Sequence, residues 1–137
     1  MNRIDLQNLA LMRIEEAKYL LDGEYFVGAY YLCGYAVECG LKACIAKQVQ
    51  AGDFPTKDNI KSHTHEFSKL ISIAKLESEL AEEFANSPKF KANWEYAKKW
   101  LPEQRYELSM NYQTAKDLYE AITDPTHGVL EWIKKFW

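Results

Sequence analysis

The first repeating pattern of apolar and polar positions spans residues 5–22. Apolar side chains recur there at intervals of three or four residues, while charged side chains fall on the other faces of a helix. These apolar side chains are Leu6, Ala10, Ile14, Ala17 and Leu21. Gly23 follows the last of them, and glycine easily adopts the left-handed conformation that ends a helix. The pattern therefore predicts an amphipathic helix that ends at about residue 22.

Residues 24–50 form the second predicted helix, which is apolar on nearly all sides. A helix with this pattern must be buried on most sides, so we expect it at the centre of the fold. Each of its glycines lowers helix propensity by up to about 1 kcal/mol relative to alanine. We interpret them as points where another backbone approaches closely: Gly28, Gly34 and Gly40.

Shorter helical patterns, separated by prolines and glycines, fill the rest of the chain. Residues 51–64 have no sustained period and predict a loop. Stripes within residues 65–101 predict a broken third helix, and residues 112–122 predict a fourth. Asp124 and Pro125 are typical of an N-cap and a first helical position. They would begin a last short helix that carries Val129, Leu130, Ile133 and Phe136.

The chain has no alternating pattern typical of strands, so we predict an all-α protein. Its 137 residues suit one domain, and 47% hydrophobic with 27% charged residues is a globular rather than a disordered composition. The simplest architecture is one domain over residues 1–137, an up-and-down bundle of four main helices with additional short helices.

A formal net charge of -3 is too small to indicate a polyanion-binding tail, so any nucleic-acid contact must come from a local patch. Residues 25–37 are the longest run without charged or strongly polar side chains, and they fall short of the roughly 18 that a membrane span needs. The first eleven residues lack the apolar block of a signal peptide. We therefore expect a cytoplasmic protein that does not associate with membranes.

The cysteines and histidines do not form a recognisable site. Cys33 and Cys44 would lie roughly 16 Å apart on the second helix, beyond disulfide reach. With Cys39, we interpret them as buried, inert thiols. His63, His65 and His127 lack the spacing of a metal site, and no familiar catalytic motif is present. We predict no metal, no cofactor and no catalytic residue.

Glu38 lies at the centre of an apolar stripe on the second predicted helix. An ionised carboxylate in that position must be paired or belong to a pocket. Lys42 follows four residues later in the favourable orientation, so a structural ion pair is the preferred interpretation. A binding site is the alternative.

Residues 89–105 combine five basic with two acidic side chains and four aromatic ones. Such a mixture can bind single-stranded nucleic acid. Phe90 and Trp94 already belong to a core stripe, which leaves Tyr96 and Trp100 as surplus aromatic residues. We interpret this pair first as a dimer interface and second as a nucleic-acid contact.

Residues 29–43 resemble the second helix of HEPN domains (higher eukaryotes and prokaryotes nucleotide-binding), which typically has the pattern A-x-x-x-x-x-x-A-x-E-x-x-L-K-A. The matching residues are Ala29, Ala36, Glu38, Leu41, Lys42 and Ala43. Leu20 and Leu21, the helix start at residues 65–70 and the pair Arg105 and Tyr106 are also similar to that family. The resemblance implies an all-α bundle that is usually a dimer.

Many HEPN domains are metal-independent RNases with an arginine followed four to six residues later by a histidine. Arg105 matches the arginine, but the histidine positions hold Met110, Asn111 and Tyr112. None of these can act as a general acid or base near neutral pH. We therefore expect no measurable ribonuclease activity. The resemblance still implies anion binding by Arg105, with Asn111 and Tyr112 at the start of the following helix.

The resulting hypothesis is a HEPN-like homodimer that binds a nucleotide, RNA or a nucleotidyltransferase-like partner without catalysis. Some HEPN proteins act with such a partner as a toxin-antitoxin pair. The alternatives are an RNase toxin that uses Arg105 with a non-standard partner and a purely structural dimerisation module. We expect Arg105 and Glu38, with Lys42, to form one polar site. Arg105 would supply a bidentate anion contact there, and Glu38 would orient a partner or the arginine itself.

Overall fold

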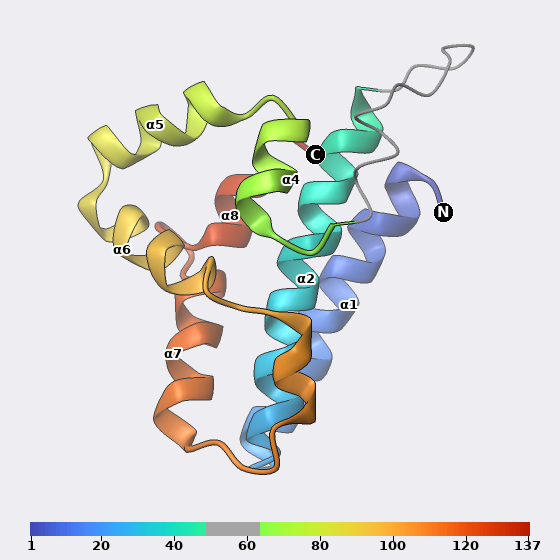
Figure 1. The fold of residues 1–137 in the computed structure, drawn as a ribbon, viewed down its shortest axis with the longest axis vertical. Coiled ribbons are helices and arrows are strands. Elements are labelled where there is room, and N and C mark those ends of the chain that lie inside the picture. The colour runs from blue at the N-terminus through green and yellow to red at the C-terminus, as the bar shows by residue number, and fades with distance from the viewer. Residues whose placement is uncertain (49–63) are drawn as a thin grey trace.

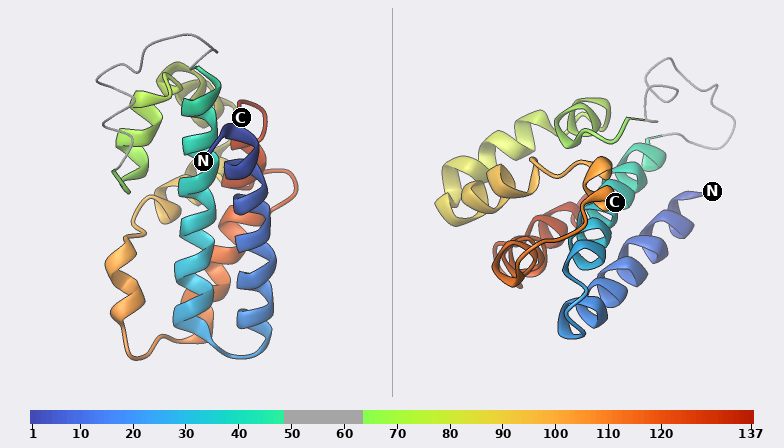
Figure 2. Two further views of the ribbon diagram at one scale, coloured as in Figure 1. Left: turned by 90° about the vertical axis from the view of Figure 1, so that its right-hand side faces the viewer. Right: turned by 60° about the horizontal axis from the view of Figure 1, so that its bottom comes forward.

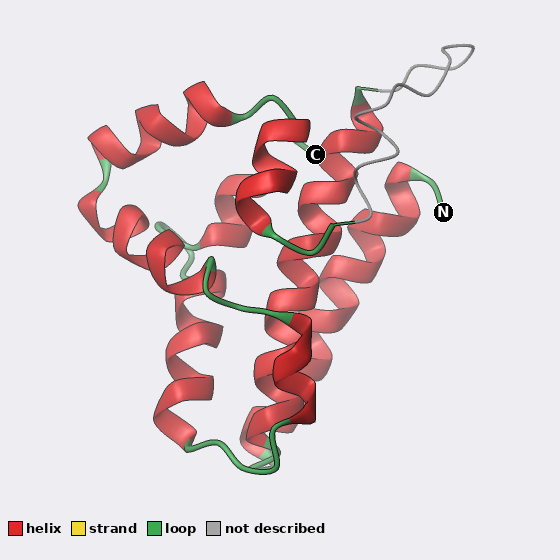
Figure 3. Cartoon of the chain, viewed as in Figure 1, coloured by secondary structure: helices red, strands yellow, loops and turns green. Residues whose placement is uncertain are grey.

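The structure is a computed structural model, which describes residues 1–48 and 64–137. Within these residues every regular element is a helix, as Figure 3 shows, and the prediction of an all-α fold is confirmed. The predicted loop over residues 51–64 lies outside the described residues, except for Thr64. His63 also lies outside them.

Two long helices, α1 (Arg3–Asp22) and α2 (Phe26–Lys47), form an antiparallel hairpin (Figure 1). Their bounds agree closely with the predicted helices over residues 5–22 and 24–50. A capping box begins α1: the Asn2 side chain accepts a hydrogen bond from the Asp5 amide at 2.8 Å, and the Asp5 carboxylate accepts one from the Asn2 amide at 3.1 Å.

Helix α2 lies at the centre of the fold, as its apolar pattern predicted. Besides α1, it contacts α4 (Phe67–Ile73), η2 (Pro102–Tyr106), α7 (Tyr112–Thr123) and α8 (Val129–Ile133). Figure 2 shows these elements on several sides of α2. The buried faces of the elements meet in one hydrophobic core.

The broken third helix consists of separate pieces: α4, α5 (Glu77–Asn86) and α6 (Pro88–Ala97). Lys75, between the first two pieces, has a positive φ of 59°, which a continuing helix does not permit. Ser87 begins α6 because its hydroxyl accepts a hydrogen bond from the Phe90 amide at 3.1 Å, and Pro88 occupies the first turn.

The prediction that Asp124 and Pro125 begin the last helix is wrong. The Asp124 carboxylate accepts hydrogen bonds from the backbone amides of Thr126 at 2.9 Å and His127 at 2.7 Å, which closes a turn. Helix α8 begins only at Val129, after Gly128. A Cβ atom at Gly128 would lie 2.5 Å from the Asp124 carbonyl oxygen, so this turn requires glycine.

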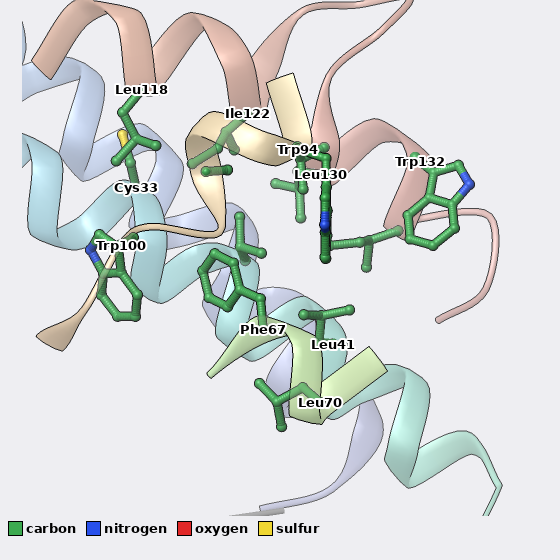
Figure 4. Close-up of a cluster of buried hydrophobic side chains, with 14 of the residues drawn as sticks. Cys33, Leu41, Phe67, Leu70, Trp94, Trp100, Leu118, Ile122, Leu130 and Trp132 are labelled. Carbon is green, nitrogen blue, oxygen red and sulfur yellow. The ribbon is translucent and has the colours of Figure 1, made fainter. Parts of the chain in front are cut away.

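The glycines of α2 make room for side chains rather than for another backbone, which corrects our interpretation. A Cβ atom at Gly34 would lie 2.1 Å from Cδ2 of Trp100. The Trp100 indole therefore packs directly on Gly34 and is only 1% exposed, in the buried cluster of Figure 4. At Gly28 and Gly40 the nearest atoms also belong to side chains.

The three cysteines are buried and free, as predicted. Burial raises the pKa of Cys33 and of Cys44 to about 12. Burial and the nearby Glu38 carboxylate raise the pKa of Cys39 to about 11. These thiols stay protonated near neutral pH and are therefore poor nucleophiles.

Helix α1 departs from the predicted amphipathic pattern. Its inner face packs on α2 through Ala10, Ala17 and Leu21. Its outer face also carries large apolar side chains, which are exposed to solvent: Ile4, Leu11, Met12 and Tyr19.

Candidate functional site

One face of α2 carries a row of polar and aromatic side chains, which we call the polar face: Tyr31, Tyr35, Glu38 and Lys42. Their spacing of four, three and four residues places them on the same side of the helix. The two tyrosines and Lys42 are half-buried, whereas Glu38 is 1% exposed. Side chains from α1, from η2 and from the residues just before α4 reach this row.

Arg105, on η2, lies at the Tyr31 end of the polar face. Its guanidinium carbon is 5.7 Å from the Tyr31 ring centroid and 4.8 Å from that of Tyr106. A guanidinium nitrogen also donates a hydrogen bond to the Tyr106 hydroxyl at 3.0 Å. Two cation–π contacts and one hydrogen bond thus hold an exposed arginine in a defined orientation.

Arg13, on α1, contacts the next tyrosine of the row. Tyr31 and Tyr35 stack with ring centroids 6.1 Å apart and an interplanar angle of 15°. The Arg13 guanidinium carbon lies 5.9 Å from the Tyr35 ring centroid, and its nitrogen pairs with Glu16 at 2.6 Å. Two stacked tyrosine rings therefore lie between two arginines. Arg13 could not be predicted from the sequence, because this contact joins two different helices.

Glu38 is held by two partners. The Lys42 ammonium lies 3.5 Å from its carboxylate, so the predicted ion pair is present. Nδ1 of His65 contacts the same carboxylate oxygen. This second partner was not predicted from the sequence, although a buried carboxylate generally needs more than one partner.

Glu38 and Arg105 lie at different levels of the polar face. In residues 1–48 and 64–137 no hydrogen bond or ion pair joins them. Tyr31, which Arg105 covers, precedes Glu38 by seven residues, or about 10 Å along the helix. Glu38 therefore does not orient Arg105 directly. Glu38 belongs to α2, and Arg105 contacts the same helix through Tyr31.

Asn111 and Tyr112 stabilise the start of α7. The Asn111 side chain accepts hydrogen bonds from the Thr114 amide and hydroxyl, both at 2.8 Å. The Tyr112 ring packs edge-on against Phe26, with centroids 5.7 Å apart, and Lys116 lies over it. In the described part of the chain no hydrogen bond or cation–π contact joins either residue to Arg105, and Figure 1 shows a loop between η2 and α7.

Trp100 and Tyr96 do not form a free aromatic pair on the surface. Trp100 is buried between Tyr31 and Phe67, with ring centroids 6.0 and 5.5 Å away. Tyr96 is half-buried, and its hydroxyl donates a hydrogen bond to the Thr114 carbonyl at 3.0 Å. The expectation that these residues lack a place in the core is wrong, because Gly34 provides the space for the indole.

Ser87 and His127 form a second polar cluster, with Oγ and Nδ1 3.0 Å apart. Ser87 is 8% exposed and its hydroxyl caps α6, while Asp124 binds the backbone rather than the ring of His127. This geometry stabilises the junction of α6 with the turn before α8. Among the described residues, no group of three or more His, Cys, Asp or Glu side chains could hold a metal ion.

Comparisons of the chain with protein-family models, curated proteins and solved structures gave no match. None of the described helices is both long and apolar enough to cross a membrane. The polar face of α2, with Arg105 and Arg13, is the surface with the clearest capacity to bind a ligand. Its chemistry combines the exposed guanidinium of Arg105 and the half-buried guanidinium of Arg13 with aromatic rings.

Proposed function

We propose that the protein is a HEPN-like domain that binds single-stranded RNA along the polar face of α2, without cleaving it. One observation carries the proposal: two stacked tyrosines, Tyr31 and Tyr35, lie between Arg105 and Arg13. The exposed Arg105 guanidinium can bind a phosphate, and the ring of Tyr106 beside it, 71% exposed, offers an aromatic surface to a base or ribose. A row of aromatic rings with a guanidinium at each end suits a flexible strand better than a rigid duplex.

The resemblance to HEPN domains supports the same proposal. Its most specific residues, Glu38 and Lys42, form an ion pair on the polar face, next to the tyrosines. We infer that they maintain the shape of this face. Arg105, the residue that matches the family's arginine, is exposed at the other end. The proposal also includes a four-helix arrangement of the HEPN type and a nucleotidyltransferase-like partner.

The prediction of no ribonuclease activity follows from the residues near Arg105. Met110, Asn111 and Tyr112 offer no group with the acid-base properties of imidazole. One observation favours the alternative function, an RNase that uses Arg105 with a non-standard partner. His65 supplies an imidazole at the far end of the polar face, where it contacts Glu38. Its side chain is 54% exposed.

Fluorescence anisotropy with a labelled single-stranded RNA of about 12 nucleotides, a length within the usual site sizes, tests the binding proposal. We expect Arg105→Ala to weaken binding by about tenfold to a hundredfold, since one stacking or cation–π contact contributes roughly 1–3 kcal/mol. The variant should also reduce the salt dependence of binding by about one phosphate contact.

Lys98→Ala is the matched control, because Lys98 is an exposed cation at the end of α6 and pairs with Glu95 at 2.6 Å. Its loss removes the same charge at another surface, so we expect little change in RNA affinity. Equal effects of the two variants would mean that only net charge matters, and the proposed site would be wrong.

Denaturing gels of the same RNA, after incubation without divalent metal, test for cleavage. We expect intact RNA with wild-type protein. Loss of a general acid-base group typically lowers a rate by about two to four orders of magnitude. Cleavage that disappears in both Arg105→Ala and His65→Ala would instead establish the RNase. If the protein neither binds nor cleaves the RNA, the structural dimerisation module becomes the better hypothesis.

A further inference from the structure

A cavity of 310 Å³ lies at the end of the molecule where α2 begins. It is lined by residues 24–28, which join α1 to α2 and form the first turn of α2, and by residues 108–110 of the loop between η2 and α7. Figure 1 and Figure 2 show the α1–α2 turn and this loop at the same end of the molecule. Two segments that are far apart in the sequence therefore build the cavity together.

The cavity continues the polar face of α2 beyond Arg105. Val27 lines the cavity and Tyr31 follows it by four residues, so both lie on the same side of the helix, about 6 Å apart along its axis. Arg105 covers Tyr31, and Leu108 of the cavity follows Arg105 by three residues in the chain. A strand whose phosphate binds Arg105 can therefore place a neighbouring nucleotide at the cavity.

Large side chains at the cavity are exposed to solvent. The side chain of Tyr25 is 68% exposed, and that of Leu108 is fully exposed. Tyr106, which contacts Arg105, is also exposed, so an apolar and aromatic surface extends from the arginine to the cavity. Exposed apolar side chains that lie together are typical of a binding surface, and tyrosine rings stack on the flat faces of bases.

Glu24 brings a carboxylate to the same cavity. Among the described residues, no hydrogen bond or ion pair engages this carboxylate, whereas the nearby Asp22 pairs with Lys18. The backbone of Glu24 has a positive φ of 68°, a conformation that glycine adopts more easily. The local fold therefore does not favour a glutamate here, and its side chain is free to bind a ligand.

Guanine is the base whose hydrogen-bonding edge best matches a carboxylate. Its ring N1–H and its exocyclic amino group are adjacent donors, and the two oxygens of a carboxylate accept from both at once. Adenine and cytosine present only an amino group on this edge, and uracil presents only a ring N–H. Ser109 lines the same cavity, and its hydroxyl can donate to the carbonyl oxygen of guanine beside N1.

We propose that this cavity, which we call the base pocket, holds one unstacked guanine of the bound RNA, with the Watson–Crick edge of the base on Glu24. The inference rests on the proposed RNA binding and adds a base preference to it. Proteins commonly recognise single-stranded RNA through bases that are splayed out, stacked on aromatic rings and bound at this edge. The charge of Glu24 also repels phosphate, so a strand without guanine gains nothing from this residue.

Fluorescence anisotropy with two RNAs of about 12 nucleotides tests the base pocket, one of uridine only and one with a single guanosine in the middle. Wild-type protein should bind the guanosine RNA about tenfold more tightly, as expected of one bidentate pair. Inosine lacks the exocyclic amino group, so its substitution for guanosine should remove most of this preference. Glu24→Gln should reduce the preference to within about threefold, because a carboxamide has one acceptor oxygen in place of two. It should not weaken binding of the uridine RNA.

Glu107→Gln is the matched control, because Glu107 is exposed in the same loop but does not line the cavity. It removes the same charge and should keep the wild-type preference. Circular dichroism melts should show that both variants fold, since both side chains are exposed.

Two results would overturn the base pocket: equal affinity of wild-type protein for both RNAs, or an unchanged preference in Glu24→Gln. Weaker binding by Arg105→Ala in the same experiment would then still support the proposed function. If wild-type protein binds neither RNA, the proposed function and the base pocket are both wrong.

Discussion

The α1–α2 hairpin and the segment of residues 64–106 reach a helical structure in different ways. The hairpin consists of two long helices whose own apolar patterns set their bounds. The segment consists of four short helices, α4, α5, α6 and η2. In this segment Phe67, Phe90, Trp94 and Trp100 are the buried aromatic residues.

The difference shows which interactions decide structure in each region. Helix α2 is long enough that its pattern of apolar residues repeats over several turns, and this pattern predicts the bounds of the helix in the sequence. The short helices carry too few turns for that, so they depend on contacts with distant residues. The Glu38–His65 contact and the packing of Trp100 on Gly34 both join the segment to α2. Substitutions of Glu38 and of Gly34 should therefore show most clearly how far the segment depends on its contacts with α2.

Glu38→Ala should have the largest effect on stability. The substitution leaves Lys42 and His65 without their carboxylate partner and removes a contact between α2 and the start of α4. We expect the free energy of unfolding to fall by about 3 kcal/mol, the lower end of the range for a broken buried pair, because His65 is half exposed. Urea unfolding measures this loss.

Arg105→Ala is the comparison for that experiment. Arg105 is exposed and contacts only the faces and hydroxyl of tyrosines, so its loss should change the free energy of unfolding by at most about 0.5 kcal/mol. The expected pattern is an unstable Glu38 variant and a stable Arg105 variant. Similar losses in both would show that the two residues act as one structural unit after all.

A feature of this fold could be predicted from the sequence when residues close together in the chain determine it. A feature that depends on contacts between separate elements could not be predicted. The bounds of α1, α2 and α7 follow from local patterns, and the Glu38–Lys42 pair follows from helical spacing. The contacts of Arg13 with Tyr35 and of His65 with Glu38 join separate elements. No spacing rule brings such residues together.

The burial of Trp100 could not be predicted for a related reason. A lone tryptophan after a short helix has no repeating partner in the sequence, so its surroundings are not apparent. The relevant signal was Gly34, more than sixty residues earlier, which leaves a space on α2 that the indole fills. The glycine was predicted to contact another backbone, whereas it contacts this side chain.

Gly34→Ala and Gly28→Ala form the second test of the comparison. Each gains up to about 1 kcal/mol of helix propensity in α2. At Gly34 the new Cβ atom would meet the Trp100 ring at 2.1 Å, so we expect a net loss of about 1–3 kcal/mol. At Gly28 the nearest atom is the flexible end of Leu20 at 3.1 Å, so stability should be unchanged or slightly higher. Equal melting temperatures would show that Trp100 does not anchor the segment.

Asp124→Asn should have the smallest effect, because this residue stabilises a local turn and one ion pair, with the exposed Lys89 at 3.3 Å. Backbone hydrogen bonds from His127 and Thr126, with the nearby Lys89, lower the pKa of the Asp124 carboxyl below its usual value. A carboxyl whose pKa is lowered by folding contributes stability above its unfolded pKa of about 3.9, and this contribution disappears as the pH falls through the folded pKa. The stabilities of wild type and variant, measured by urea unfolding, should therefore differ most near pH 6 and converge as the pH falls through the lowered pKa of folded Asp124. The asparagine can still accept both backbone hydrogen bonds, so the variant isolates the charge. A difference between the two proteins that stays constant from pH 6 to pH 2 would mean that the turn depends on geometry alone and not on the ionised carboxylate.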